Sequence, residues 1–133
     1  MRLEVSQRAD LAVRALILLR RSPSRLRSAD LARALGTTPG FVPQVMSPLV
    51  RAEWIGSRPG PMGGYEPIAD LGALSVLQVV EEIDGPTDSG RCVVAEQQCE
   101  PSQPCALHHS WDRARRELVE ALASLTIADV GAT

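Results

Sequence analysis

The chain has 133 residues, of which 44% are hydrophobic and 3% aromatic, and a formal net charge of −2. This length suits one domain with a modest core. Because aromatic residues are scarce, Leu, Val, Ile and Ala must fill that core, which favours helices. The longest apolar run, Ala15 to Leu19, is far too short to cross a bilayer. We therefore expect a soluble, cytoplasmic protein with no membrane partner.

The small net charge conceals a contrast between the two halves of the chain. Residues 1–60 carry ten Arg and four acidic residues, a balance of +6, whereas residues 61–133 carry four Arg and twelve acidic residues, a balance of −8. This contrast indicates that the first half meets an anion such as nucleic acid. All fourteen basic residues are Arg, which suits phosphate and guanine contacts, although codon bias is the simpler cause.

Two helices are predicted before residue 37. Apolar residues with helical spacing predict the first over roughly residues 3–21, and the segment 22–24, Ser-Pro-Ser, ends it. Ser28 is the expected N-cap of a short second helix over residues 29–35. Gly36 supplies the expected C-terminal stop of that helix.

The third predicted helix begins with Thr38 as N-cap and Pro39 as its first residue, and it runs through Val50. Pro43 and Pro48 both fall within it. Pro43 lies near the first turn, where its cost is smaller. An interior proline costs a helix about 3 kcal/mol, so Pro48 is expected to bend or shorten this one.

A strand is predicted to begin at Trp54-Ile55, to turn through the Pro- and Gly-rich segment 58–64 and to return at residues 65–67. Helices joined by a tight turn and followed by a hairpin are typical of a winged helix-turn-helix, which binds DNA in the major groove. The alternative is a plain three-helix bundle with a decorative hairpin. The basic balance of this half favours DNA, so residues 1–70 are predicted to be a DNA-binding domain.

Beyond residue 70 the sequence predicts two more helices around a loop. Ser75 and Gln78 form a capping box that opens a helix through Ile83. A last helix begins at Leu107 or His108 and ends near Leu125. The predicted fold class is therefore mainly α with a small β-hairpin wing and a long C-terminal helix. The three regions are a connecting helix, a cysteine loop, and a dimerisation helix with its tail, at residues 71–87, 88–106 and 107–133.

The last predicted helix carries an apolar stripe opposite a charged face. Nothing in a small winged domain obviously covers this stripe, so it predicts a homodimer interface. The alternative is that the helix packs back on the first helix of its own chain, and a mixture of both satisfies the pattern as well. The stripe residues are Trp111, Ala114, Leu118, Ala121, Leu122 and Leu125.

The loop holds all three cysteines of the chain, in the order Cys92-(six)-Cys99-(five)-Cys105-(two)-His108. Three cysteines cannot all pair with one another, so a disulfide framework is a poor interpretation. Thiolates with a histidine can hold an iron–sulfur cluster or zinc, and gaps this wide fit a polynuclear cluster better than one tetrahedral ion. A metal-free thiol switch stays open. A catalytic Cys–His pair has no identifiable orienting partner.

Short motifs follow one another along nearly the whole chain. They are Met1-Arg2-Leu3, residues 12–16, residues 29–32, Gly63-Gly64-Tyr65, the three cysteines, and residues 125–129. In this order they resemble the bacterial iron–sulfur cluster regulators, which include IscR-, NsrR- and RirA-type repressors. Two departures stand out: the first cysteine gap is one residue longer than usual, and Pro59 displaces Arg58 from the position directly before the wing glycine.

The resemblance implies a homodimer in which a cluster controls DNA affinity and the cysteine loop lies near the first helix of the partner subunit. It leaves two candidates for the fourth ligand. His108 matches the histidine of 2Fe–2S IscR-type members. Asp10 matches the aspartate that ligates a 4Fe–4S cluster from the partner subunit in NsrR-type members, and is otherwise a helix-surface carboxylate. We favour His108, and so a 2Fe–2S cluster, because histidine is the more usual non-thiolate donor.

Polar residues around the third predicted helix are candidates for DNA contact. Residues at its positive N-terminus suit phosphates or base edges, and Gln44 suits adenine. Arg58 could enter the minor groove from the wing, although for each arginine a solvated charge is the alternative. The DNA-binding candidates are Ser28, Thr37, Thr38, Gly40, Gln44, Arg51 and Arg58.

Together these patterns predict a transcription regulator, by resemblance a repressor, that binds a pseudo-palindromic double-stranded DNA operator as a homodimer and has no enzymatic activity. Its DNA affinity is expected to follow an iron–sulfur cluster that senses redox state, nitric oxide or iron–sulfur supply. The first alternative is a zinc- or thiol-based regulator without a cluster. The second alternative is a cluster- or zinc-binding scaffold or enzyme that uses a winged fold without binding DNA. The positive charge of the first half argues against this alternative.

Overall fold

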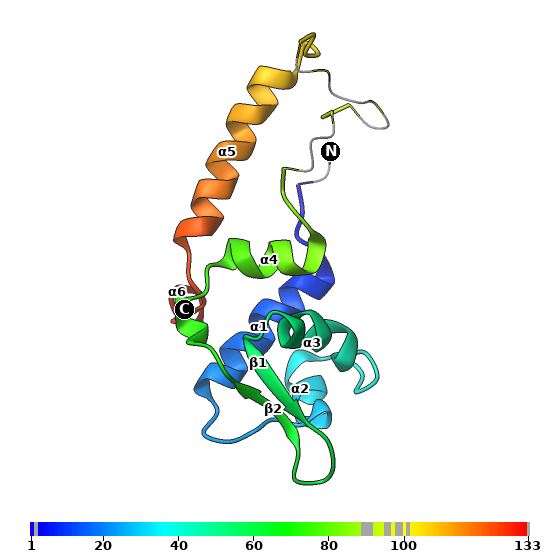
Figure 1. Ribbon diagram of the computed structural model, residues 1–133, viewed down its shortest axis with the longest axis vertical. Coiled ribbons are helices and arrows are strands. Elements are labelled where there is room, and N and C mark those ends of the chain that lie inside the picture. Colours follow the sequence, from blue (N-terminus) through cyan, green and yellow to red (C-terminus); the bar gives the residue numbers. More distant parts are fainter. Residues whose placement is uncertain (2, 89–91, 95–96, 98–99, 101, 133) are drawn as a thin grey trace.

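The computed structural model of the protein describes residues 1, 3–88, 92–94, 97, 100 and 102–132, and Figure 1 shows how their elements are arranged. The fold class is as predicted, mainly α with a β-hairpin wing. Within these ranges no helix is long and apolar enough to pass through a membrane. The elements are α1 (Gln7–Arg21), α2 (Ser28–Leu35), α3 (Val42–Arg51), β1 (Ile55–Arg58), β2 (Gly64–Pro67), the 3₁₀ turn η1 (Leu71–Ala73), α4 (Val76–Asp84), α5 (His108–Ser124) and α6 (Ile127–Gly131).

The first helix begins later than predicted. Ser6 is its N-cap, with a side-chain oxygen that accepts a hydrogen bond from the N–H of Ala9 (3.0 Å). The Ser6 hydroxyl also donates to the carboxylate of Asp84 at the end of α4 (2.6 Å). Leu3, which the helical pattern had included, lies before the helix and is exposed. The start of α1 is therefore set by a side-chain cap and by a contact with α4, neither of which apolar spacing reveals.

The helix-turn-helix differs from the prediction in its caps. Arg27, and not Ser28, is the N-cap of α2; its N–H donates to the Asp30 carboxylate (3.1 Å), and Ser28 is the first helical residue. Gly36 ends α2 in the left-handed region, as predicted (φ 71°). The α helix does not begin at Pro39, because Thr38 caps a separate turn by accepting from the N–H of Phe41 (3.3 Å).

Pro48 does not shorten α3. It is buried, and α3 continues beyond it to Arg51. Within α3 the Ser47 hydroxyl donates to the carbonyl of Pro43 (2.6 Å), one turn earlier. Burial of the Pro48 ring contributes apolar area that offsets the missing backbone hydrogen bond.

The hairpin is joined to the segment before α2. Leu26 and Tyr65 exchange two backbone hydrogen bonds, from Leu26 N–H to Tyr65 C=O (3.1 Å) and from Tyr65 N–H to Leu26 C=O (2.8 Å). Gly64 makes this possible: its φ is +125°, and a Cβ there would lie 2.7 Å from the Leu26 carbonyl oxygen. A Cβ on Gly63 would collide with the Arg58 carbonyl oxygen. The two glycines before Tyr65 are therefore required by the backbone itself.

Gly64→Ala is expected to destabilise the protein by about 1–3 kcal/mol, because it adds backbone strain and a clash with the Leu26 segment. Gly60→Ala is the matched control. Gly60 also has a positive φ (+89°), but nothing lies within 4 Å of the added carbon, so only the strain remains. Urea denaturation of both variants measures the difference, and equal losses of stability would contradict the importance of the Leu26–Tyr65 contact.

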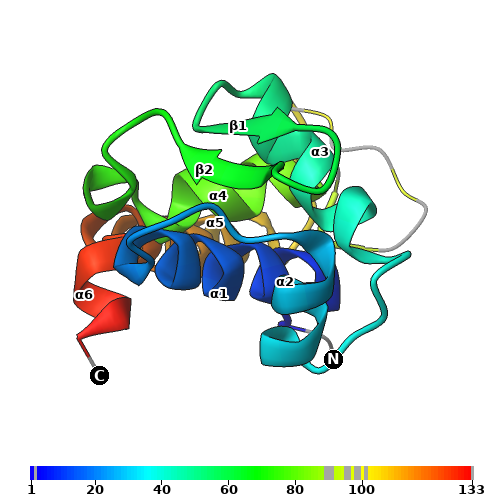
Figure 2. The ribbon, with the colours of Figure 1, turned by 90° about the horizontal axis from the view of Figure 1, so that it is seen from below.

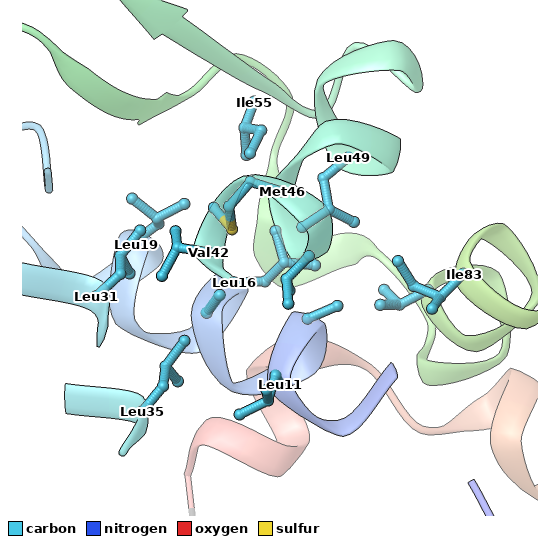
Figure 3. Packing of buried hydrophobic residues seen from close by; sticks show 14 of the residues in the cluster. Leu11, Leu16, Leu19, Leu31, Leu35, Val42, Met46, Leu49, Ile55 and Ile83 are labelled. Atoms are coloured by element: carbon cyan, nitrogen blue, oxygen red, sulfur yellow. The ribbon is translucent and has the colours of Figure 1, made fainter. Parts of the chain in front are cut away.

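The core lies where α1 crosses the helix-turn-helix. Figure 3 shows Leu16 and Leu19 of α1, Val42 and Met46 of α3, and Ile55 of β1 converging in one apolar cluster. The cluster continues toward α4 through Val79 and Ile83 and includes no aromatic residue among its buried members. The predicted aliphatic core is confirmed for the described residues.

A short helix that was not predicted separately, α6, closes the fold. Thr126 caps it by accepting from the N–H of Asp129 (3.1 Å), and Ile127 is fully buried. α6 packs against α1 and η1. By contrast, no residue of α5 is buried. The short helix α6 therefore packs back on α1, whereas α5 packs against α4 and not on α1, so the predicted return of the long helix to the first helix is not seen among the described residues.

Candidate functional site

The predicted DNA-binding residues lie on α2, on α3, in the turn between them and on the hairpin. In Figure 2 the hairpin and α3 lie above α1, and α2 lies beside its right-hand end. Gln44 is exposed in the first turn of α3, and Thr38 and Gly40 are exposed in the turn that precedes it. Ser28 and Thr37 are half-buried, at the start of α2 and just after its end. The turn between α2 and α3 thus carries Thr37, Thr38 and Gly40 directly before the helix that holds Gln44, whereas Ser28 lies at the opposite end of α2.

The two arginines among the candidates occupy different places. Arg51 is exposed at the last residue of α3, which puts it about 10 Å along the helix axis from Gln44. Arg58 ends β1 with 62% of its side chain exposed, and its Nε lies 3.4 Å from Oε1 of Glu66 on the facing strand. Arg51 is therefore not gathered with the residues before α3, and Arg58 is already paired.

The hairpin also brings in an arginine that sequence reasoning missed. Arg25 Nε lies 3.0 Å from Oε2 of Glu66, so one carboxylate joins Arg25 and Arg58. Nothing in the spacing of these residues signals the contact. It depends on the Leu26–Tyr65 backbone pairing, which places the loop after α1 beside β2.

Two of the predicted metal ligands lie together. The sulfur atoms of Cys92 and Cys105 are 3.6 Å apart. Cys92 is buried and accepts a hydrogen bond from the N–H of Val94 (3.4 Å), while Cys105 is half-buried. Two thiolates on one tetrahedral metal ion, each at about 2.3 Å, are about 3.8 Å apart. The pair therefore has the spacing of two ligands of one metal ion. Cys99 lies outside the described residues.

The two candidates for the fourth ligand are not placed alike. His108 is the first residue of α5; its backbone N–H donates to the Cys105 carbonyl (3.1 Å), and its ring packs edge-on against that of His109 (centroids 5.3 Å apart). Asp10 lies on α1 and faces Arg14 at 3.7 Å, with 60% of its side chain exposed. Among the described residues, no three His, Cys, Asp or Glu side chains gather as a metal site within one subunit.

The long helix α5 rises from the body of the molecule, with the cysteine loop at its upper end in Figure 1. Leu107, Leu118 and Leu125 are 53%, 44% and 39% exposed. Arg115 connects the helix to the segment after α4 through Asp88 (3.3 Å). Of the predicted stripe, Trp111 and Leu122 are half-buried, while Ala114, Leu118, Ala121 and Leu125 remain exposed.

Comparison with known proteins identifies the family. A family model named Rrf2, described as an iron-dependent transcriptional regulator, matches residues 5–133. A protein of Mycobacterium tuberculosis assigned as an HTH-type transcriptional regulator is 30% identical over 130 residues, which cover 96% of this chain and 81% of that protein. The regulator IscR of Vibrio vulnificus is 25% identical over 114 residues, 86% of this chain and 67% of its own. The match to an Azotobacter vinelandii protein of the same kind is 27% identical over 102 residues, 77% of this chain, and spans only 62% of that relative.

Solved structures share the fold. CymR of B. subtilis, titled the global cysteine regulator, superposes with a TM-score of 0.78 at 22% identity, over 98% of both chains. IscR of T. potens superposes with a TM-score of 0.72 at 20% identity, over 96% of this chain and 85% of its own. These likenesses show the fold, and the family model that matches residues 5–133 shows the family. This chain therefore belongs to the Rrf2 family of transcriptional regulators.

Proposed function

We propose that the chain is a homodimeric, DNA-binding regulator whose operator affinity is controlled by an iron–sulfur cluster on Cys92, Cys99 and Cys105. The observation that carries the proposal is the 3.6 Å separation of the Cys92 and Cys105 sulfur atoms, across thirteen positions of the chain. The description of the family as iron-dependent and the relation to an IscR protein support iron over zinc. In this proposal residues 1–70 bind DNA, residues 71–87 connect, residues 88–106 hold the cluster, and residues 107–133 form the dimer.

The donor set fits such a cluster. Thiolates are the usual ligands of iron–sulfur centres, and a histidine can replace one of them. When bound, the cluster supplies redox-active iron and a rigid link between segments of the chain. His108 is the favoured fourth ligand, because its backbone is already tied to Cys105. Asp10 of a second subunit is the alternative, which would go with a 4Fe–4S instead of a 2Fe–2S cluster.

The DNA-binding proposal follows from the polar group before α3. In the exposed turn before α3, the Thr38 hydroxyl and the Gly40 N–H suit phosphate oxygens. Gln44 is exposed where a recognition helix meets base edges. Arg58 extends the surface to the wing, and Arg51 is a further candidate for a phosphate. Two such surfaces in a dimer would match a pseudo-palindromic operator with half-sites one helical turn apart.

Gln44→Ala is expected to cost about 1–3 kcal/mol of discrimination at one base pair in each half-site, because a bidentate contact to adenine is lost. Ser47→Ala is a control on the same helix, since the Ser47 hydroxyl already bonds the Pro43 carbonyl (2.6 Å). Selection from a random duplex library by each variant measures the base preferences. Unchanged preferences for Gln44→Ala would show that Gln44 does not read DNA.

Anaerobic purification followed by an absorption spectrum and metal analysis tests the cluster directly. We expect a brown protein with broad visible absorption that contains iron and acid-labile sulfide. A colourless protein with stoichiometric zinc would contradict the cluster. Separate His108→Ala and Asp10→Ala variants then show which residue is the fourth ligand. Replacement of the true ligand should change the absorption spectrum, and the other variant should keep the wild-type spectrum as a control.

A thiol switch is the second candidate, which the same cysteine geometry favours. In thiol–disulfide exchange with a small-molecule disulfide, the two thiols would give a Cys92–Cys105 disulfide and two small-molecule thiols. Their sulfur atoms need only approach from 3.6 Å to about 2.05 Å. Oxidised glutathione added to the metal-free protein should then reduce the free thiols from three to one per chain. Retention of all three thiols would exclude this candidate.

A further inference from the structure

We propose that Arg25 is a DNA-contacting residue and that Glu66 is a positioning residue, which holds Arg25 and Arg58 as one pair facing a phosphate. The inference rests on the proposed DNA-binding function and extends it to two residues that lie outside α2 and α3. The geometry consists of one carboxylate with an arginine on each oxygen: Arg25 Nε to Oε2 at 3.0 Å and Arg58 Nε to Oε1 at 3.4 Å.

The backbone fixes this arrangement from both sides. Arg25 precedes Leu26, whose two hydrogen bonds with Tyr65 hold the loop beside β2. Glu66 follows Tyr65 and pairs across the hairpin with Gly56, while Arg58 pairs with Gly64. Both arginines are therefore carried by backbone that is already hydrogen-bonded, which reduces the conformational entropy that ordering them on DNA would cost.

Exposure and charge point to an anion as the occupant of this surface. The Arg25, Glu66 and Arg58 side chains are 31%, 34% and 62% exposed, so the network is open to a ligand. Two guanidinium groups and one carboxylate leave a local charge of +1. Each guanidinium has further N–H donors besides the one that contacts Glu66. A DNA phosphate is the anion that the neighbouring helix-turn-helix would bring here.

Glu66 has two opposing effects on DNA binding. Its negative charge weakens attraction for any phosphate, and its two contacts limit the rotamers of the arginines. The first effect lowers affinity for all DNA, and the second favours one orientation of Arg58 at the wing. Pro59 displaces Arg58 from the position before the wing glycine, and the Glu66 contact shows how the displaced side chain is held. Glu66 is thus expected to raise discrimination while lowering non-specific affinity.

Glu66→Gln tests this function with two probes: a duplex selected by the wild-type protein from a random library, and a random-sequence duplex. We expect the variant to bind the random duplex about fivefold more tightly, as loss of one nearby repulsive charge implies, and the ratio of the two affinities to fall. Glu82→Gln, which removes the same charge from an exposed position on α4, should leave both affinities unchanged. Equal behaviour of the two variants would overturn the role of Glu66.

Glu66→Asp separates charge from position, because it keeps the charge and shortens the side chain. It should keep wild-type affinity for the random duplex and still lose discrimination; unchanged discrimination would overturn the positioning role. Arg25→Gln should reduce the slope of log affinity against log salt by about 1. A lower melting temperature with an unchanged slope would make Arg25 purely structural. If the wild-type protein shows no salt-dependent DNA binding, the proposed function itself fails.

Discussion

Cys92→Ser is expected to prevent binding of the proposed cluster. Cys92 is the buried member of the cysteine pair, and its sulfur lies 3.6 Å from that of Cys105. Its replacement leaves Cys105 as the remaining sulfur ligand of the pair. Loss of even an outer-shell partner lowers metal affinity about 10–100-fold, so loss of a direct ligand should exceed this. Iron and acid-labile sulfide per chain, measured after anaerobic purification, should fall at least about tenfold.

Ser102→Ala provides the control, since Ser102 is exposed in the same loop and its hydroxyl donates to a carboxylate oxygen of Glu100 (3.4 Å). This variant should keep wild-type iron and visible absorption. Cys92→Ser with wild-type iron content would show that the pair is not a metal site. Loss of iron in both variants would mean that the loop, and not its thiolates, controls binding.

Leu118→Glu is expected to convert the proposed homodimer into a monomer. No residue of α5 is buried within the subunit, and Leu118 is 44% exposed on its apolar face. Burying one leucine contributes about 1.5–3 kcal/mol, and burying an unpaired carboxylate costs several kcal/mol more. In a two-fold symmetric interface each substitution acts twice. Sedimentation equilibrium at micromolar concentration measures the change.

Arg113→Glu is the matched control for this interface. Arg113 is exposed on α5, about 140° around the helix from Leu118, so a new glutamate there should leave the dimer intact. A monomeric wild-type protein would contradict the proposed interface, as would a Leu118→Glu variant that remains dimeric at the same concentration. Dissociation by both substitutions would show that charge, and not the apolar face, controls assembly.

Local signals predicted the fold well where the structure uses them. The glycine at residue 36 ends α2, and the capping box of Ser75 and Gln78 begins α4, because both act within one turn of helix. Helix starts were predicted less well. The N-cap of α1 is Ser6, which also donates a hydrogen bond to Asp84, a residue seventy-eight positions later in the chain. Apolar spacing near residue 6 does not reveal such a contact. The start of α6 could have been predicted from the capping box of Thr126 and Asp129. It was overlooked because these residues directly follow the apolar stripe of the long helix.

The candidate site divides in the same way. The sequence predicted the cysteines as a ligand set, and two of them, Cys92 and Cys105, do lie together, because residues on one loop can meet without help from the rest of the fold. The Arg25–Glu66–Arg58 network was not, because it needs the loop after α1 to pair with β2 through Leu26 and Tyr65. Residue spacing and charge counts carry no information on such a tertiary contact. The structure shows that Gly64 is needed for the close approach of the Leu26 backbone, but the sequence does not say which segment approaches it.

The most direct test of the account is one DNA titration carried out twice on the same anaerobic sample. The affinity for a duplex selected by the protein is measured with the cluster present and again after a chelator has removed the iron. Control of DNA binding by the cluster predicts a change of about tenfold or more, which corresponds to a coupling free energy within the usual 1–3 kcal/mol. Equal affinities before and after removal, in a protein that had contained the cluster, would contradict the account.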